Sequence, residues 1–341
     1  MKYLVTGCCG FTGSHLCDVL REEGLEYRAT DLESAPRDFL PSDAEFVASD
    51  LTDPSTLPAA LDGVDVVLHT AAIFNFSAPK QLLKSVNVDG MENLCRASHE
   101  AGVRRLVTWS TCGVYGRAKG KLPILEDHPK NPVEDYSRSK HQQDQVARRW
   151  HEEEGLPVTI IRPGVVYGPR ARYGFAQVIE TIAGAPVVPV PVNFRYHMSP
   201  VHARDVGRAA LYLSARAEAD GEEYHVVDCS GITMTGLFYF LAALLEKPTI
   251  PVYVPPRLAS FGGRVMAEIA GIVSKVTGRP PIIEKAPVRY FPLDLDVSNE
   301  KLLAAGYRFE YPDVRVGLIE TIGWMRERGE LEVNLLEKIT A

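Results

Sequence analysis

The sequence predicts an α/β protein with a doubly wound parallel sheet and a smaller C-terminal lobe, and two observations support this. First, the apolar residues 3–5 are followed by three glycines spaced three apart and then by apolar residues at helical spacing, a pattern typical of strand, tight loop and helix. Second, strand and helix patterns keep alternating to about residue 165, as a parallel sheet with crossover helices requires.

The glycine loop is suited to a dinucleotide, as in a Rossmann-type domain. The first glycine permits a backbone conformation closed to other residues, the second lets main-chain N–H groups approach a diphosphate, and the third lets the helix pack on the strand. The next apolar stretch ends in Asp31, near the offset at which a carboxylate accepts hydrogen bonds from an adenosine ribose and repels a 2′-phosphate. We therefore expect NAD as the cofactor, with NADP less favoured. Arg28 and Arg37 are the residues that could bind the 2′-phosphate of NADP instead.

The remaining elements follow in order along the chain. The predicted strands are residues 45–48, 65–72, 105–109 and 158–161, and the predicted helices are residues 80–101 and 133–154. We expect residues 1–165 to form the nucleotide-binding domain, and a later stretch, about 195–230, to return to it through a strand at 223–227. Residues 166–341 then form mainly the substrate-binding lobe.

The composition of the lobe differs from that of the first domain. Residues 165–200 are rich in proline, glycine and aromatic side chains, which predicts a loop-rich segment around an apolar ligand. Residues 258–276 carry apolar side chains at helical spacing and predict an amphipathic helix. It either packs on the lobe core or forms a lid or membrane-surface helix over an apolar substrate, although it has few of the basic residues that a membrane surface favours.

Tyr136 and Lys140 lie four residues apart on a predicted helix, and therefore on one face of it. A free phenol has a pKa of about 10, too high for efficient proton exchange at neutral pH. A neighbouring ammonium, helped by an oxidised nicotinamide, favours the phenolate and lowers that pKa. A hydroxyl from Ser110 or Thr111, where the strand 105–109 ends, would complete a set that polarises a carbonyl or holds an alcohol.

Taken together, these residues resemble the extended short-chain dehydrogenases/reductases, the NAD-dependent epimerase/dehydratase superfamily, over roughly residues 1–330. The matching segments are residues 6–13, 50–51, 70–72, 87–90, 110–116, 136–140 and 162–169. By this resemblance, Tyr136 donates or accepts the proton, while Lys140 lowers the pKa of Tyr136 and binds the nicotinamide ribose. The hydroxyl residue of the family falls on Thr111, with Ser110 one residue away.

Two absences favour one branch of this superfamily. Thr111 is followed by Cys112 and Gly113, whereas the dehydratases that the chain resembles carry an Asp-Glu pair there. Val165 and Val166 stand where nucleotide-sugar enzymes tend to carry an asparagine. The pattern is similar to the 3β-hydroxysteroid dehydrogenase and dihydroflavonol reductase branch. We expect hydride transfer between nicotinamide and a secondary alcohol or ketone on an apolar, steroid-, lipid- or aryl-like substrate.

Two alternatives stay open. One is an NAD-dependent nucleotide-sugar epimerase, which would keep its cofactor bound. The other is a non-catalytic sensor of NAD, against which the retention of both Tyr136 and Lys140 argues.

The predicted site residues come from strand ends and loops. The resemblance and the loop pattern assign the cofactor to Gly7, Gly10, Phe11, Thr12, Gly13, Asp31, Asp50, Leu51, Thr70, Ala71, Ala72, Asn87, Tyr136, Lys140, Pro163 and Val165. Aromatic side chains expected to line the substrate pocket are Phe74, Phe76, Tyr173, Phe175 and Tyr196.

Composition argues against several kinds of partner. The net charge of −7, without a block of like charges, does not favour nucleic acid. No apolar run suits an integral membrane segment, and no signal peptide is apparent, so we expect a cytoplasmic protein. Cysteine and histidine spacings match no metal site. Helices 80–101 and 133–154 resemble those through which the family forms homodimers.

Overall fold

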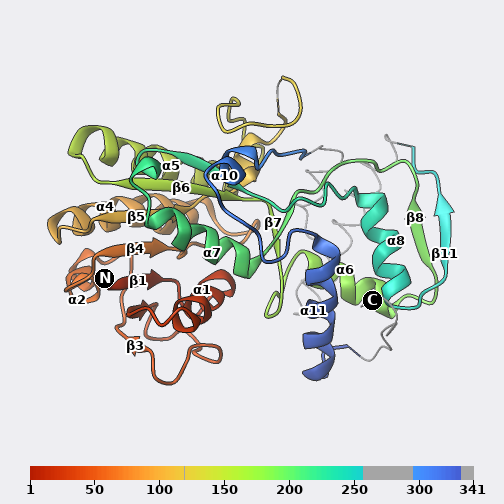
Figure 1. Ribbon diagram of the computed structural model, residues 1–341, viewed down its shortest axis with the longest axis horizontal. Coiled ribbons are helices and arrows are strands. Elements are labelled where there is room, and N and C mark those ends of the chain that lie inside the picture. The colour runs from red at the N-terminus through yellow and green to blue at the C-terminus, as the bar shows by residue number, and fades with distance from the viewer. Residues whose placement is uncertain (119, 256–294, 332–341) are drawn as a thin grey trace.

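The computed structural model describes residues 1–118, 120–255 and 295–331, and the amphipathic helix predicted over 258–276 lies outside these ranges. A seven-stranded parallel sheet dominates the larger part of the protein, with strand order β10-β6-β5-β4-β1-β2-β3 (Figure 1). Its strands are β1 (Tyr3–Thr6), β2 (Tyr27–Thr30), β3 (Glu45–Phe46), β4 (Val66–His69), β5 (Arg105–Trp109), β6 (Val158–Pro163) and β10 (Glu223–Val226). The predicted doubly wound sheet is confirmed.

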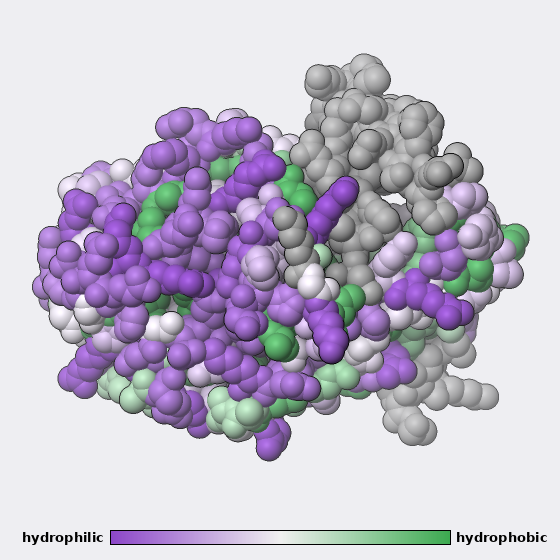
Figure 2. Space-filling model, turned by 90° about the horizontal axis from the view of Figure 1, so that it is seen from above, coloured by the Kyte–Doolittle hydropathy of each residue, from purple (hydrophilic) through white to green (hydrophobic). Residues whose placement is uncertain are grey.

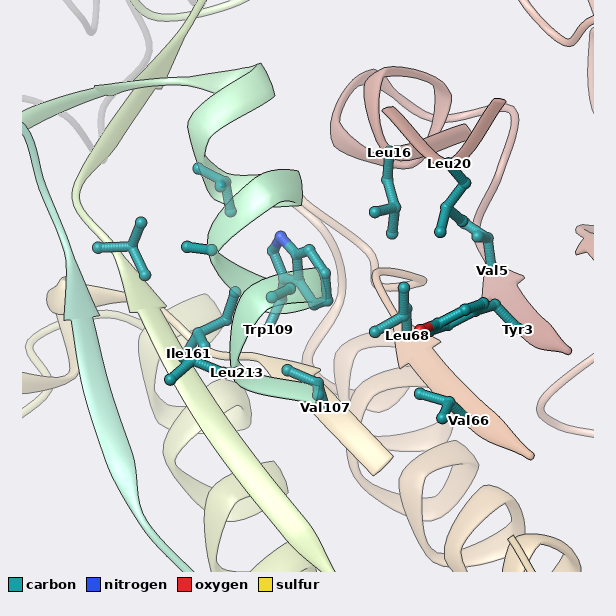
Figure 3. Close-up of a cluster of buried hydrophobic side chains, with 14 of the residues drawn as sticks. Tyr3, Val5, Leu16, Leu20, Val66, Leu68, Val107, Trp109, Ile161 and Leu213 are labelled. Carbon is teal, nitrogen blue, oxygen red and sulfur yellow. The ribbon is translucent and has the colours of Figure 1, made fainter. Parts of the chain in front are cut away.

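Helices cover both faces of this sheet, so most strands are apolar along their whole length. One face carries α1 (Phe11–Glu22) and α7 (Ala203–Ser214), which pack on each other and on the strands. Figure 3 shows the core between them and the sheet, with Leu16 and Leu20 of α1 directed toward the strands. The other face carries α2 (Leu57–Leu61), α4 (Gly90–Glu100) and α5 (Asp135–Glu154).

The helix predicted over 80–101 is continuous but not uniform. It consists of α3 (Lys80–Leu83), a π-helical segment η2 (Lys84–Asp89) and α4. The helix predicted over 133–154 begins at Asp135, because the side chain of Glu134 accepts a hydrogen bond from the Ser137 N–H and caps the first turn. It ends at Gly155, whose φ of 70° suits a left-handed helix stop.

The lobe lies beyond the carboxyl ends of the strands and has its own apolar core (Figure 1). Its elements are β7 (Val165–Tyr167), α6 (Phe175–Gly184), β8 (Val188–Pro191), β9 (Pro200–His202), α8 (Met234–Leu244), β11 (Thr249–Val252) and α11 (Val314–Glu327). Residues 165–200 are thus more regular than expected, because Phe175, Ile179 and Ile182 have helical spacing and all are buried in the lobe core.

Short elements complete the described chain. They are the 3₁₀ turns η1 (Pro54–Thr56), η3 (Cys112–Tyr115) and η4 (Ala217–Ala219), and α10 (Glu300–Ala304), which packs against β10. Seen from above, the surface is largely hydrophilic over the sheet domain, with apolar residues in small groups (Figure 2). Within the described ranges, no helix combines the length and apolar character needed to cross a membrane.

Candidate active site

A cavity of about 1380 Å³ runs from the loop after β1, past the carboxyl ends of β4 and β5, into the lobe between α6 and α8. Ligands of doubly wound sheets bind at this edge. The volume exceeds the roughly 300–1,000 Å³ of an ordinary ligand pocket, so the cavity has room for a cofactor and a substrate together. Every predicted site residue lines it except Gly13 and Asn87.

The loop between β1 and α1 leaves its backbone bare toward the cavity. Gly7 has a φ of 69°, and a Cβ there would lie 2.7 Å from the Ala71 Cα. A Cβ on Gly13 would lie 2.1 Å from the Gly7 carbonyl oxygen, so Gly13 serves close packing behind the loop. Gly10 precedes α1 without any side-chain cap, and the first N–H groups of this helix suit a diphosphate.

Asp31 faces the cavity at the end of β2. Its Oδ2 accepts a hydrogen bond from the Cys9 N–H at 3.0 Å, and its Oδ1 accepts one from the Leu32 N–H at 2.8 Å. Arg28 is buried on the other side of the strand, where it pairs with Glu45 at 2.7 Å and donates to three backbone carbonyls. Arg28 is therefore a structural residue and not the phosphate ligand that the sequence left open.

The second candidate cation, Arg37, lies on the surface. It pairs with Glu33 at 3.1 Å and its guanidinium lies 3.8 Å from the ring centroid of Phe46. Asp50 and Leu51 line the neighbouring part of the cavity. Of the three residues Arg28, Asp31 and Arg37, it is therefore Asp31, directly after β2, whose charged group lines this end of the cavity.

Asn87, predicted from the sequence to bind the cofactor, lies behind the cavity wall. It is fully buried in η2, where its amide oxygen accepts from the Ile73 N–H at 2.8 Å and its amide nitrogen donates to the Ser139 Oγ at 3.0 Å. Its partners are protein groups from the loop after β4 and from α5. Asn87 therefore stabilises the wall of the cavity through these hydrogen bonds and does not itself line the cavity.

Tyr136 and Lys140 both reach the cavity from the first turns of α5, and both are buried. The Lys140 ammonium donates to the Gln143 Oε1 at 2.5 Å. The amide nitrogen of Gln143 in turn donates to the Thr108 Oγ1 at 2.7 Å and to the Trp109 carbonyl at 3.2 Å. Sequence reasoning missed Gln143, although its position three residues after Lys140 places both on one helix face.

The protein environment opposes charge on both residues. Burial raises the pKa of Tyr136, and the carboxylates of Glu134 and Asp144 raise it further. Burial lowers the pKa of Lys140 to about 8, against the opposing effect of Asp144. This differs from the expectation that Lys140 lowers the pKa of Tyr136, because desolvation dominates and the ammonium is directed to Gln143. The protein groups alone thus keep the phenol neutral.

The two candidate hydroxyls have different surroundings. Ser110 is buried and its Oγ donates to the Asp144 Oδ2 at 2.8 Å. Thr111 is half-buried at the cavity wall, and its Oγ1 accepts from the Gly113 N–H at 3.1 Å. Since that bond uses an acceptor lone pair, the Thr111 hydroxyl proton stays available to a ligand.

A buried ionic cluster stands behind this wall. Arg162, with no exposed surface, pairs with Asp144 at 2.9 Å and with Glu223 on β10. Because Ser110 bonds to the same oxygen of Asp144, the cluster joins β5, β6, β10 and α5. The position of Thr111 is thereby tied to the helix that carries Tyr136.

Aromatic rings surround the Tyr136 side chain. Its ring centroid lies 5.1 Å from that of Phe74 and 5.5 Å from that of Phe76, with edge-on geometry in both pairs. Phe74 is 54% exposed, so it can bury further area against a ligand. Tyr173 and Tyr196 line the lobe side, while Phe175 is only 2% exposed and belongs mainly to the lobe core.

Among the described residues, Cys8, Cys9 and Asp31 bring one ligand atom each to within 4.8 Å of one another. The spacing rules that predicted no metal did not detect this group, since two of its members are adjacent in sequence and the third lies on the next strand.

Comparisons with known proteins show the relatives of the chain in sequence and in fold. The sequence model of the NAD dependent epimerase/dehydratase family matches residues 3–227. A relative from Escherichia coli O157:H7, N-acetyl-alpha-D-glucosaminyl-diphospho-ditrans,octacis-undecaprenol 4-epimerase, is 27% identical over 90% of each chain. A 3-beta-hydroxysteroid dehydrogenase from Mycolicibacterium neoaurum is 30% identical over 68% of this chain and 67% of its own. The structure of the UDP-glucose 4-epimerase of Thermus thermophilus in complex with NAD superposes with a TM-score of 0.72 at 26% identity, covering 96% of this chain and 99% of that one.

Proposed function

Because the chain belongs to the NAD-dependent epimerase/dehydratase family, we propose that it is an NAD-dependent oxidoreductase for a secondary alcohol or ketone on an apolar substrate. The family confirms NAD as the predicted cofactor. The observation that supports the substrate class is the course of the cavity. Beyond Tyr136 it continues between lobe helices along apolar side chains, among them Phe175, Val178, Ile182, Leu237 and Phe238. Such walls exclude water and suit a ring-bearing or lipid-like group.

The proposed roles follow from the positions of the side chains. NAD, held by the glycine loop and Asp31, supplies the site that accepts or donates hydride. Tyr136 passes the proton to or from the substrate oxygen, and its neutral phenol suits donation to a ketone. Thr111 donates a hydrogen bond that holds the same oxygen, while Lys140 contributes a positive charge at the same wall of the cavity. Phe74 and Phe76 keep water away from the reacting atoms.

A second candidate is an epimerase, since the E. coli relative that aligns over 90% of each chain is named as one. Its substrate, by that name, joins a sugar to a diphosphate and a polyprenol. Cationic side chains would strengthen the binding of a second diphosphate in the cavity. Of the arginines at the cavity wall, Arg170 already pairs with Asp18 at 2.7 Å, whereas Arg172 is exposed. The apolar end of the cavity would suit the lipid part of such a substrate.

The experiment that tests the proposal follows nicotinamide absorbance with added NAD and a panel of sterols, aryl alcohols and other apolar secondary alcohols. UDP-sugars, GDP-sugars and a polyprenyl-diphosphate sugar form the second arm. Net NADH formation in the first arm is the expected result. Conversion of a sugar to its epimer without net NADH would replace the proposal with the epimerase.

The catalytic assignment has its own test. Tyr136→Phe removes the transferable proton and little else, so it should lower kcat by at least about a hundredfold and leave NAD affinity unchanged. Near-normal turnover in this variant would refute the role of Tyr136.

A further inference from the structure

The two cysteines of the cofactor loop direct their sulfurs to the same side. The Sγ atoms of Cys8 and Cys9 lie 3.7 Å apart, although neighbouring side chains of an extended chain point in opposite directions. The loop is fixed by its surroundings: the Cys8 N–H donates to the Thr30 carbonyl, and the Cys9 N–H donates to Asp31. The pair is therefore a preformed dithiol beside a carboxylate.

The separations in this group suit a tetrahedral cation. With Zn–S bonds of about 2.3 Å, tetrahedral angles place two sulfurs about 3.8 Å apart, close to the observed 3.7 Å. The three ligand atoms all lie within 4.8 Å of one another, so an Asp31 oxygen would reach the ion if the carboxylate gave up its hydrogen bond from the Cys9 N–H. Two sulfurs and one oxygen suit Zn²⁺ or Cd²⁺, whereas Mg²⁺ and Ca²⁺ require oxygen ligands.

Access to the group is from the cavity. Cys9 and Asp31 line the cavity, and Cys8 lies fully buried behind them. An ion would reach Cys9 and Asp31 first and keep its fourth position toward the cavity. Binding converts both thiols to thiolates and releases two protons to solvent, so that one dication meets three anionic ligands.

From this geometry we propose that Cys8, Cys9 and Asp31 form a site for a thiophilic divalent cation, and that its occupation prevents NAD from binding. The competition with NAD rests on the proposed function, in which Asp31 accepts hydrogen bonds from the adenosine ribose. A carboxylate oxygen bonded to Zn²⁺ has fewer lone pairs left for the ribose hydroxyls, and the ion and its fourth ligand occupy the space in which the ribose would lie. The enzyme is therefore inhibited by zinc in competition with NAD and recovers when a chelator is added.

Zinc binding itself is measured without any enzymatic turnover. The purified protein, freed of metal by a chelator and kept reduced, is titrated with ZnCl₂ by calorimetry in two buffers of different ionisation enthalpy. A CdCl₂ titration follows the ultraviolet charge-transfer absorbance of Cd–thiolate bonds. We expect one tight site, proton release, and at least about tenfold weaker binding in Cys9→Ser, which loses one of three ligands. The matched control is Cys229→Ser, which alters an exposed cysteine outside the cavity.

Competition is measured by titrating NADH, followed by its fluorescence, at several zinc concentrations. We expect the apparent Kd for NADH to rise linearly with zinc concentration in the wild type and in Cys229→Ser. In Cys9→Ser, at least about tenfold more zinc should be needed for the same rise. Equal zinc affinity in wild type and Cys9→Ser would overturn the site. Zinc binding that leaves the Kd for NADH unchanged would overturn the competition. Absence of turnover on every alcohol would refute the proposed function but leave both titrations valid.

Discussion

Replacing Lys140 with methionine should stabilise the protein near neutral pH, even though the role proposed for Lys140 predicts a loss of turnover. Burial lowers the pKa of Lys140 from its ordinary 10.5 to about 8. Each pKa unit corresponds to about 1.4 kcal/mol, so keeping this ammonium buried costs about 3 kcal/mol below pH 8. Methionine retains the unbranched stem but leaves the Gln143 oxygen without its donor, a cost of about 1–3 kcal/mol. The expected net gain is about 0–2 kcal/mol.

The pH dependence of this gain identifies its cause. Between pH 8 and 10.5 the unfolded chain binds the Lys140 proton and the folded protein does not, so wild-type stability rises with pH across this window. Lys140→Met lacks this contribution, so its stability relative to the wild type should fall by about 3 kcal/mol from pH 8 to pH 10.5, which turns the gain into a deficit.

Urea unfolding at pH 7, 8, 9 and 10, followed by tryptophan fluorescence, measures the difference, with the exposed Lys80→Met as control. Parallel stability profiles for wild type and Lys140→Met would show that the Lys140 ammonium is not desolvated.

Three further predictions concern the proposed site and assembly. Thr111→Ala should lower kcat by about 10²–10³-fold through loss of a donor to the substrate oxygen. Ser110→Ala should mainly lower the free energy of unfolding, by about 1–3 kcal/mol, because Asp144 Oδ2 loses one of its two hydrogen-bond donors among the described residues and keeps only Arg162. If steady-state kinetics and urea unfolding gave the reverse pattern, the roles of Thr111 and Ser110 would have to be exchanged. Asp31→Ala should narrow the preference for NAD over NADP by about 10–100-fold, and an unchanged ratio of the two Kd values would mean that the ribose is recognised elsewhere. We also propose a homodimer through α4 and α5; sedimentation as a monomer at micromolar concentration would exclude it.

The sheet could be predicted from the sequence because its strands are apolar on both faces and end in recognisable loops. The same local signals place Tyr136, Lys140 and the glycine loop at the cavity. Local pattern could not show that the Lys140 ammonium is directed to Gln143, since that depends on the fixed position of Thr108 on a neighbouring strand.

Other features depend on contacts between residues far apart in the sequence. The choice between Ser110 and Thr111 follows from Asp144, 34 residues after Ser110. The role of Arg28 depends on carbonyls more than thirty residues away. The short distance between the Cys8 and Cys9 sulfurs depends on the backbone conformation of one loop, which the spacing of residues in the sequence does not predict. In each case the sequence shows which residue is present, but the direction of its side chain depends on tertiary contacts.

The buried cluster of Arg162, Asp144 and Glu223 has a consequence for the response of the protein to heat. The cost of removing charges from water falls as temperature rises, because the hydration of ions is entropically unfavourable. Apolar burial, which holds the lobe core together, gains no comparable advantage per unit area. On warming, the relative weight of the ionic cluster therefore increases, and the wall carrying Thr111 is anchored by the interactions that weaken least. Thermal inactivation is accordingly expected to begin in the lobe and to reach last the wall of Thr111 and Tyr136, the two residues proposed to contact the substrate oxygen.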